Sequence, residues 1–359
     1  MTETDWTDRA GAVREGEALD AERLASYLHE KLHIDGPMAI TQFPSGHSNL
    51  TYLVRIGERE LILRRPPFGS RGKTAHDMGR EYRILSQLHR VLPQAPRALA
   101  YCDDAASASI LGAPFYVMER IAGVILRRRP PAGLALDAAT ARRLSEAFID
   151  QLAALHAVDY RAVGLGDLGK PEGYVERQVS GWTRRYQDAR TDEIADVEWI
   201  AEWLDGRIPP ESGATLVHGD FKYDNLVLDA ADLTRVIGIL DWEMATLGDP
   251  LVDLGVALGY WVQADDSQVL RQFAFGPTDL PGMLTRRELA ERYAARTGRA
   301  IDNLVFYYCF ALFKTAVVAQ QIYYRYRQGL TKDARFAALG EAVKILAHTA
   351  VAAAESGRV

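Results

Sequence analysis

The chain has 359 residues, of which 48% are hydrophobic and 25% are charged, and its formal net charge at pH 7 is −6. This length can form one large domain or two lobes, and the composition is that of an ordinary globular protein. The acidic balance argues against nucleic acid as a partner. Two cysteines, Cys102 and Cys309, are too few for a disulfide framework or a zinc site, so a cytoplasmic location is expected.

The first third of the chain is predicted to be rich in strands. Residues 1–18 are polar, have no apolar signal-peptide core and are expected to be loose. Asp20 can cap a helix whose apolar residues follow at helical spacing. Strands are predicted at 38–43, 51–56, 61–65, 98–103 and 115–120, and a second helix at 74–92. Residues 19–120 are therefore expected to form a small N-terminal lobe.

From residue 121 to 359 the pattern becomes mostly helical. Helices are predicted at 138–156, 174–189, 192–205, 251–261, 286–297, 303–328 and 332–354, and short strands at 214–217, 226–228 and 236–240. The most apolar stretch, 304–319, is interrupted by Lys314 and is short for a membrane span. It is expected to be a buried helix, so no membrane partner is predicted.

The stretch from 218 to 243 carries the strongest functional signal. It reads His218-Gly219-Asp220, then Asn225 in the same loop, then Asp241 at the end of a strand. This spacing is typical of sites that transfer a phosphoryl group from Mg-ATP. Asp220 can accept a hydroxyl proton, while Asn225 and Asp241 offer the hard oxygen ligands that Mg²⁺ prefers. Singly, these residues could be a core histidine, a turn asparagine and a capping aspartate, but their joint order favours the functional reading.

With these motifs, the chain resembles the aminoglycoside phosphotransferase and choline kinase-like family. The resemblance runs from about residue 41 to 347 and is closest to the branch that is also found fused to acyl-CoA dehydrogenase domains. It rests on the segments 45–49, 63–67, 80–82, 218–225 and 240–250. It implies an α+β, bilobal protein kinase-like fold, with a small antiparallel-sheet N-terminal lobe carrying one helix and a larger, mostly helical C-terminal lobe. It also implies ATP and Mg²⁺ as cofactors.

Several residues of the N-terminal lobe are expected to hold the nucleotide. Gly46, Ser48 and Asn49 lie in a turn between two strands, where backbone N–H groups can cover phosphates, although a plain hairpin would look the same. Arg64 stands where kinases usually place a phosphate-binding lysine, and Glu81 in the following helix is its expected partner. Two alternatives stay open: Arg65 could fill this role, or Arg64 could form only a surface ion pair.

The adenine site and the loop lysine are predicted from their order in the chain. Met118, Glu119 and Ile121 match the connector between the lobes, where adenine would meet backbone groups and the methionine side chain. Lys222 follows Asp220 closely and is either near the γ-phosphate or a solvated loop residue. Asp249 and Asp253 are expected to hold the backbone of the catalytic loop or His218 in place, and the direction of Glu243 is left open.

The acceptor is expected to be a small molecule. Gly219 occupies the position where protein kinases carry an arginine, and only a short segment follows Asp241, which argues against a protein substrate. Arginines at 184, 185, 325 and 327 favour an acceptor with an anionic part, and the resemblance implies a hydroxy acid or hydroxyacyl-CoA. An aminoglycoside or choline-like amino-alcohol kinase and a catalytically weak nucleotide-binding module remain alternatives. A metallohydrolase would leave the Arg64–Glu81 pair unexplained. The oligomeric state is left open.

Overall fold

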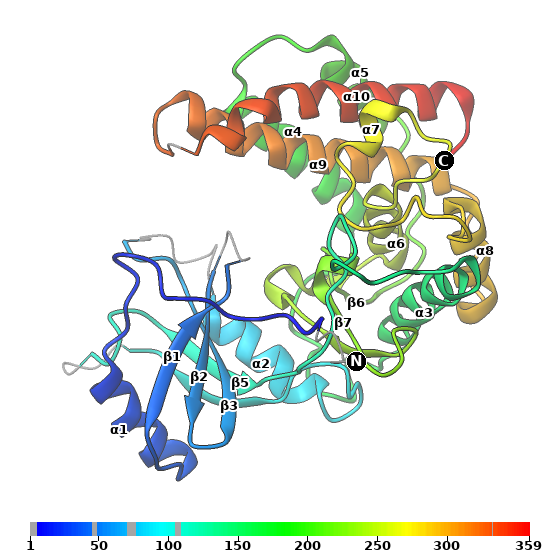
Figure 1. The fold of residues 1–359 in the computed structure, drawn as a ribbon. Helices are drawn as coiled ribbons and strands as arrows, with labels where there is room; N and C mark the ends of the chain where they lie inside the picture. Colours follow the sequence, from blue (N-terminus) through cyan, green and yellow to red (C-terminus); the bar gives the residue numbers. More distant parts are fainter. Residues whose placement is uncertain (1–5, 45–48, 70–76, 105–108, 332) are drawn as a thin grey trace. The chain divides into compact units, whose positions relative to one another are not determined.

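The computed structural model describes residues 6–44, 49–69, 77–104, 109–331 and 333–359 (Figure 1). The chain divides into two compact units. The first comprises Met1–Ile125, Val163–Leu165 and Leu226–Glu243, and the second comprises Leu126–Ala162, Gly166–Asn225 and Met244–Val359.

An antiparallel sheet forms the centre of the first unit. Its five strands have the order β1-β2-β3-β5-β4 and are β1 (Met38–Gln42), β2 (Leu50–Ile56), β3 (Arg59–Arg65), β4 (Ala98–Cys102) and β5 (Phe115–Glu119). Gly57 joins β2 to β3 with a φ of 57°, a backbone conformation that glycine adopts without steric cost. The predicted strands are therefore confirmed.

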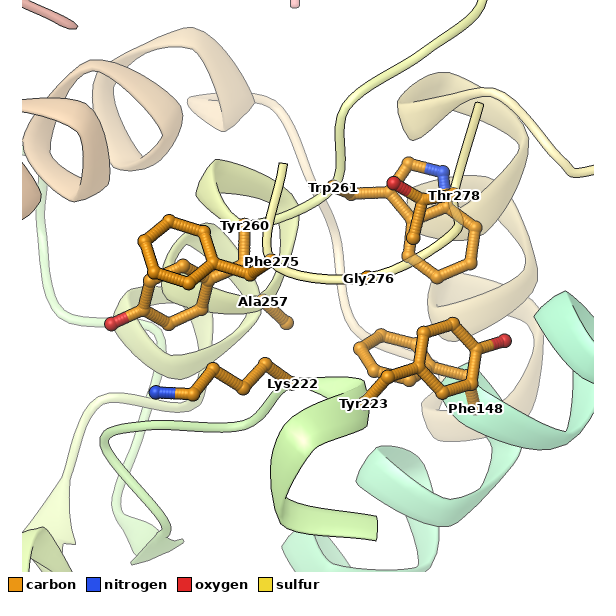
Figure 2. Close-up of a pocket in the computed structure, with 9 residues that line it drawn as sticks. All are labelled: Phe148, Lys222, Tyr223, Ala257, Tyr260, Trp261, Phe275, Gly276 and Thr278. Carbon is orange, nitrogen blue, oxygen red and sulfur yellow. The ribbon is translucent and has the colours of Figure 1, made fainter. Parts of the chain in front are cut away.

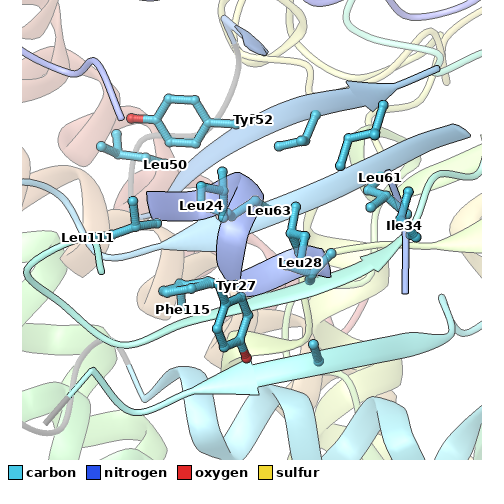
Figure 3. Close-up of a cluster of buried hydrophobic side chains, with 14 residues drawn as sticks. Leu24, Tyr27, Leu28, Ile34, Leu50, Tyr52, Leu61, Leu63, Leu111 and Phe115 are labelled. Atoms are coloured by element: carbon cyan, nitrogen blue, oxygen red, sulfur yellow. The ribbon is translucent and has the colours of Figure 1, made fainter. Parts of the chain in front are cut away.

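The two faces of this sheet are covered by different helices. Helix α1 (Ala21–Leu32), capped by Asp20, packs Leu24, Tyr27 and Leu28 into an apolar cluster with Leu63 (Figure 3). Helix α2 (Met78–Leu88) packs against β4 and β5. Successive side chains of a strand point to opposite faces, so Leu63 and its neighbour Arg64 face different surroundings.

Two further segments belong to the first unit. The hairpin of β7 (Leu226–Leu228) and β8 (Val236–Ile239) bonds to Val124 and to the carbonyl of Gln94, whereas the sequence prediction placed all residues after 120 in the helical lobe. The segment 6–18 was expected to be loose. Instead, Gly11 pairs with Gln42, and the carbonyl of Glu17 accepts a hydrogen bond from Tyr52.

The second unit is mostly helical. Its α-helices are α3 (Ala138–His156), α4 (Tyr174–Ala189), α5 (Ala195–Asp205), α6 (Pro250–Gly259), α7 (Gln268–Arg271), α8 (Arg286–Thr297), α9 (Leu304–Arg327) and α10 (Leu339–Ser356). Short 3-10 helices lie at Tyr223–Asn225 and Ala334–Ala338, and another at Trp242–Met244, where the chain passes from the first unit to the second. Strand β6 (Thr215–Val217) pairs with β9 (Thr246–Gly248), a strand that the sequence analysis did not predict.

Helix α9 is the central helix of the second unit and contacts α10, α6, α4 and α5. By length and composition, two helical segments in the described part of the chain are apolar enough to cross a membrane, Leu304–Arg327 and Ala334–Ser356. In the first, 72% of the most apolar window is buried inside the protein. This burial agrees with the predicted core helix, since core helices of globular proteins pass the same test.

Candidate active site

In the second unit, the loop that follows β6 is held by a buried aspartate of α6. Asp253 accepts hydrogen bonds from the backbone N–H of His218 at 2.6 Å and of Gly219 at 2.8 Å, and its Oδ2 lies 3.1 Å from Nε2 of His156. Burial raises the pKa of Asp253, but its bond to His156 and the nearby His218 together hold it below its usual value. The prediction that this aspartate ties down the loop backbone is confirmed. Asp249 instead caps α6 and accepts from Ser212.

Gly219 has a backbone conformation that explains its presence in the loop. Its φ is 79°, and a Cβ at this position would lie 3.1 Å from the carbonyl oxygen of Met244. Both conditions favour glycine over any residue with a side chain. The loop therefore turns sharply before Asp220, and an arginine at position 219 would be strained.

Three side chains hold the carboxylate of Asp220. Its Oδ2 accepts from Nζ of Lys222 at 2.6 Å and from Nδ2 of Asn225 at 3.0 Å, and its Oδ1 accepts from the hydroxyl of Tyr260 at 2.7 Å. Burial alone would raise the pKa of Asp220, but Lys222, Lys314 and Tyr260 hold it below its usual value. The group is therefore an ionised hydrogen-bond acceptor at neutral pH. The structure brings together Asp220, Asn225 and Lys222, and Tyr260 is an addition that the sequence analysis missed.

Lys222 is a half-buried partner of Asp220, in contrast to the solvated alternative. Its Nζ lies 4.9 Å from the ring centre of Tyr260 and 5.7 Å from that of Phe275. Figure 2 shows these three side chains on one side of a small cavity that Tyr223 and Trp261 also line. The volume of this cavity is about 10 Å³, room for about one water molecule. The aromatic rings thus fix the lysine without providing space for a substrate.

Lys314 of α9 also reaches the loop, a contact that the sequence analysis did not predict. Its side chain is 95% buried, and Nζ donates to the carbonyl oxygen of Gly219 at 2.6 Å. Burial lowers the pKa of Lys314, although Asp220 and Asp253 oppose this effect. A lysine inside an otherwise apolar run is itself a signal, because a buried cation needs a partner.

In the first unit, Arg64 is the centre of a second polar cluster. Its Nη2 donates to Oδ1 of Asp241 at 2.9 Å and lies 3.8 Å from Oε2 of Glu243, while Nε lies 3.6 Å from Oε2 of Glu81. Burial alone would lower the pKa of Arg64, but Glu81, Tyr116 and Asp241 together raise it above its usual value. The predicted Arg64–Glu81 pairing is thus a buried ion pair, and the surface alternative is wrong.

Glu81 is oriented by neighbours from two other elements. The hydroxyl of Tyr116 donates to its Oε2 at 2.8 Å, and Nδ2 of Asn49 donates to its Oε1 at 3.3 Å. Tyr116 lies opposite Arg64 in the pairing of β3 with β5, which explains how it reaches this cluster. Burial raises the pKa of Glu81, against the effect of Arg64. Asn49 also donates to Glu243 at 2.8 Å, so Glu243 faces this cluster.

Arg65 points away from this cluster. It donates to the carbonyl oxygens of Pro66 and Leu111, and its guanidinium lies 3.7 Å from the ring centre of Phe68. The alternative that Arg65 replaces Arg64 as the phosphate-binding cation is therefore not supported by its position. The difference follows from the alternation of side chains along β3.

The remaining predicted residues lie on β5, after it, or outside the described part of the chain. Met118 is buried and Glu119 is exposed at the end of β5, where the Glu119 N–H already donates to the carbonyl of Arg97. Ile121 packs near Gly238 of β8. Two residues of the predicted phosphate-covering turn, Gly46 and Ser48, fall outside the described residues, and only Asn49 of that turn is placed.

Asp241 and Asn225 offer oxygen atoms suited to a metal ion, each within its own unit. Asp241 has a φ of 64°, an uncommon conformation for a residue with a side chain, which is concentrated at functional positions. In Asn225, Nδ2 donates to the carbonyl and the carboxylate of Asp220, which leaves Oδ1 for another partner. Among the described residues, no group of three or more His, Cys, Asp or Glu is arranged to hold a metal. Mg²⁺ commonly takes only one or two protein carboxylates together with substrate phosphates.

A family model described as "Phosphotransferase enzyme family" matches residues 39–289. The chain belongs to this family. The resemblance on which the sequence analysis relied is thereby confirmed, and it covers β1 to α8.

Curated relatives of this phosphotransferase chain have longer sequences. Acyl-CoA dehydrogenase family member 10 from Mus musculus is 34% identical over 341 residues, which cover 94% of this chain and 31% of the relative. Acyl-CoA dehydrogenase family member 11 from Gallus gallus is 35% identical over 301 residues, which cover 82% of this chain and 38% of the relative. The chain thus spans about a third of the length of these two relatives.

Solved structures confirm the predicted fold class. A protein from Ralstonia eutropha described as a putative aminoglycoside phosphotransferase superposes with a TM-score of 0.80 at 29% identity, covering 94% of this chain and 99% of its own. An aminoglycoside phosphotransferase solved with GDP and kanamycin gives 0.62 at 16% identity, covering 92% and 98%. A third, solved with AMP-PNP and hygromycin B, gives 0.56 at 16% identity, covering 90% and 98%. The last two support the kinase-like fold alone.

Proposed function

We propose that this phosphotransferase chain moves the γ-phosphoryl group of ATP to a hydroxyl group of a small molecule. The observation that carries the proposal is the ionised carboxylate of Asp220, which Lys222, Asn225 and Tyr260 hold in one orientation. Such a fixed, acceptor-only group is suited to orient a hydroxyl and to receive its proton. The family match supports the same reaction class.

The roles of the other residues are proposed from their chemistry and from the family resemblance. Mg-ATP supplies the phosphoryl group and the charge of the metal ion. Asn225 and Asp241 would hold Mg²⁺ through their side-chain oxygens, and Arg64 would hold phosphate oxygens. The donor set supports this assignment, because Glu81, Asp241 and Glu243 place three carboxylates around a single guanidinium. A divalent cation would balance the remaining negative charge. Gly46, Ser48 and Asn49 would cover the phosphates, and Met118, Glu119 and Ile121 would line the adenine site.

The chain's own residues prepare the transfer by holding the loop and the carboxylate of Asp220 in place. Asp253 and Lys314 fix the backbone of the loop, so that Asp220 is held before the acceptor arrives. Asp220 accepts the hydrogen bond of the acceptor hydroxyl and takes its proton late in the transfer. Lys222, already bonded to Asp220, keeps that carboxylate ionised and can face the phosphate. Preorganisation of this kind contributes most of the catalysis in phosphoryl transfer.

A hydroxy acid or a hydroxyacyl-CoA is our first proposal for the acceptor. It is supported by relatives that are named acyl-CoA dehydrogenase family members. An aminoglycoside or choline-like amino alcohol is the alternative, since solved neighbours were captured with kanamycin and hygromycin B. We propose on composition that the protein acts in the cytoplasm, with neither nucleic acid nor membrane as a partner.

A catalytically weak nucleotide-binding module is a second candidate, favoured by one observation. The guanidinium of Arg64 is bonded to Asp241, the proposed metal ligand, so nucleotide binding must share or break that bond. The two candidates are separated by a panel of hydroxy acids, hydroxyacyl thioesters, aminoglycosides and amino alcohols incubated with Mg-ATP. An active kinase releases ADP above the background without acceptor, and a weak module binds ATP but shows no acceptor-dependent release.

A further inference from the structure

The second unit contains a larger cavity beside the catalytic loop, lined by helices α4, α6 and α9. Its volume is about 160 Å³, enough for about ten water-sized positions and therefore for a small organic molecule. Gly219, the neighbour of Asp220, contributes to its wall. The cavity therefore reaches the backbone of the loop that carries the proposed base.

The walls of this cavity combine aromatic surface with two cations. Tyr174 and Trp182 of α4 and Phe310 of α9 supply the aromatic part, and Arg185 and Lys314 supply the charges. Such a mixture of apolar walls with a few placed polar groups is typical of small-molecule sites. Phe310 and Lys314 are one helical turn apart, and so are Trp182 and Arg185, which places each pair on one helix face.

The two cations converge on a single indole ring. The guanidinium of Arg185 lies 4.6 Å and Nζ of Lys314 lies 5.7 Å from the ring centre of Trp182. Within the described residues, the Lys314 ammonium makes one direct hydrogen bond, to Gly219, although it has three donor hydrogens. Arg185 also helps to lower the pKa of Lys314, so an anion bound near these two cations would favour both charges. The carboxylate that lines the cavity, Asp253, is already bonded to two backbone N–H groups and His156.

We propose that this cavity is the acceptor site and that it takes a small hydroxylated molecule with an anionic group, a carboxylate in its simplest form. Arg185 and Lys314 bind the anion, the aromatic walls contact the apolar part, and the hydroxyl is presented to Asp220. This inference rests on the proposed phosphotransferase function. Of the four arginines that suggested an anionic acceptor in the sequence, only Arg185 lines the cavity.

The test uses three probes of one carbon skeleton: a hydroxyoctanoate, the matching octanediol and the matching amino-octanol. Each is titrated into the full chain by calorimetry in the absence of nucleotide. The carboxylate probe is expected to bind about tenfold more tightly than the diol, because charge-assisted hydrogen bonds are stronger than neutral ones. Equal or tighter binding of the diol or the amino-octanol overturns the proposal, as does the lack of carboxylate binding at millimolar concentrations.

Two charge-reversal variants on the same helix make the test specific. Arg185→Glu should weaken hydroxyoctanoate binding by about tenfold and leave diol binding unchanged. Arg184→Glu is the matched control, since Arg184 is exposed like Arg185 but lies outside the cavity lining, and it should bind like the wild type. Equal effects of the two variants would contradict the assignment of Arg185. The binding experiment requires no turnover, so it tests the acceptor site even if the protein transfers no phosphoryl group. If the protein phosphorylates only cationic acceptors, the proposed phosphotransferase function stands and the anionic acceptor site is wrong.

Discussion

Arg64 donates a hydrogen bond from Nη2 to Oδ1 of Asp241 across 2.9 Å. This bond joins the cation at the kinase-lysine position to the carboxylate at the proposed metal-ligand position. The side chain of Arg64 is only 9% exposed, whereas that of Asp241 is 32% exposed, so solvent screens the pair from the Asp241 side. Glu81 therefore orients the guanidinium of Arg64, and this guanidinium in turn orients Asp241.

Arg64→Ala should reduce nucleotide affinity by about tenfold or more, because it removes a buried, multiply bonded cation. Arg64→Lys should retain part of the affinity, since an ammonium keeps the charge but loses the planar fork. Arg59→Ala, an exposed arginine on the same strand, is the control. In a calorimetric double-mutant cycle with Glu81→Gln, the losses should be less than additive. Fully additive losses would show that Arg64 and Glu81 do not act as one unit.

Asp241→Ala should weaken the binding of Mg-ATP far more than that of metal-free ATP, because its proposed role acts through the ion. Metal-free ATP is expected to bind no worse than to the wild type, since Arg64 loses a competing carboxylate. Parallel titrations with Mg²⁺ and with a chelator measure both affinities. Equal losses in the two titrations would assign Asp241 a purely structural role.

Tyr260→Phe should move the acidic limb of the pH profile of kcat/KM to higher pH. The pKa of Asp220 is held low in part by the Tyr260 hydroxyl, so removing this donor raises that pKa. Activity requires the ionised carboxylate. As the pH is lowered, the variant therefore loses activity at a higher pH than the wild type does. Lys222→Met should shift the limb in the same direction and further, because Lys222 has the larger effect on Asp220. An unchanged acidic limb in both variants would show that this limb does not report the protonation of Asp220.

Asp253→Asn should destabilise the second unit by about 2–4 kcal/mol, because an amide cannot accept all the hydrogen bonds that this buried carboxylate accepts. The pKa of Asp253 is lowered in the folded protein, so its contribution is present above the unfolded value of 3.8 and is lost as the pH falls through the folded value. The difference in Tm from the wild type should therefore narrow in acid. Asp302→Asn, an exposed aspartate, should show neither effect. A constant difference across this range would mean that the charge of Asp253 does not contribute to stability.

The sequence was most informative where local signals and core periodicity agree. The helices predicted at 138–156, 174–189 and 286–297 have the observed bounds, and Asp137 and Thr285 cap two of them as helix-starting residues do. The motif residues Asp220 and Asn225 lie within hydrogen-bonding distance because their spacing is confined to one short loop. Arg64 and Glu81 meet because consecutive elements of a lobe are adjacent in space.

Some residues reach the site only through tertiary contacts, and no cap residue or short-range spacing in the sequence predicts their role. Tyr260, Lys314 and Tyr116 lie far along the chain from the groups that they contact, and each is part of an apolar helix or strand or follows one directly. The periodic pattern assigns such positions to the core. Strand β9 is only three residues long and carries a glycine, so its pairing with β6 depends on the fold around it.

The central claim is that Asp220 assists the transfer of a phosphoryl group from ATP to an acceptor hydroxyl. The most direct test compares the wild type with Asp220→Asn in Mg-ATP and a reactive acceptor, with the phosphorylated product measured by mass spectrometry and ATP binding by calorimetry. The account predicts acceptor phosphorylation by the wild type and a loss of about 100-fold or more in kcat for the variant, with ATP affinity largely retained. Turnover near that of the wild type in a folded Asp220→Asn variant would contradict it, as would a wild type that phosphorylates no acceptor.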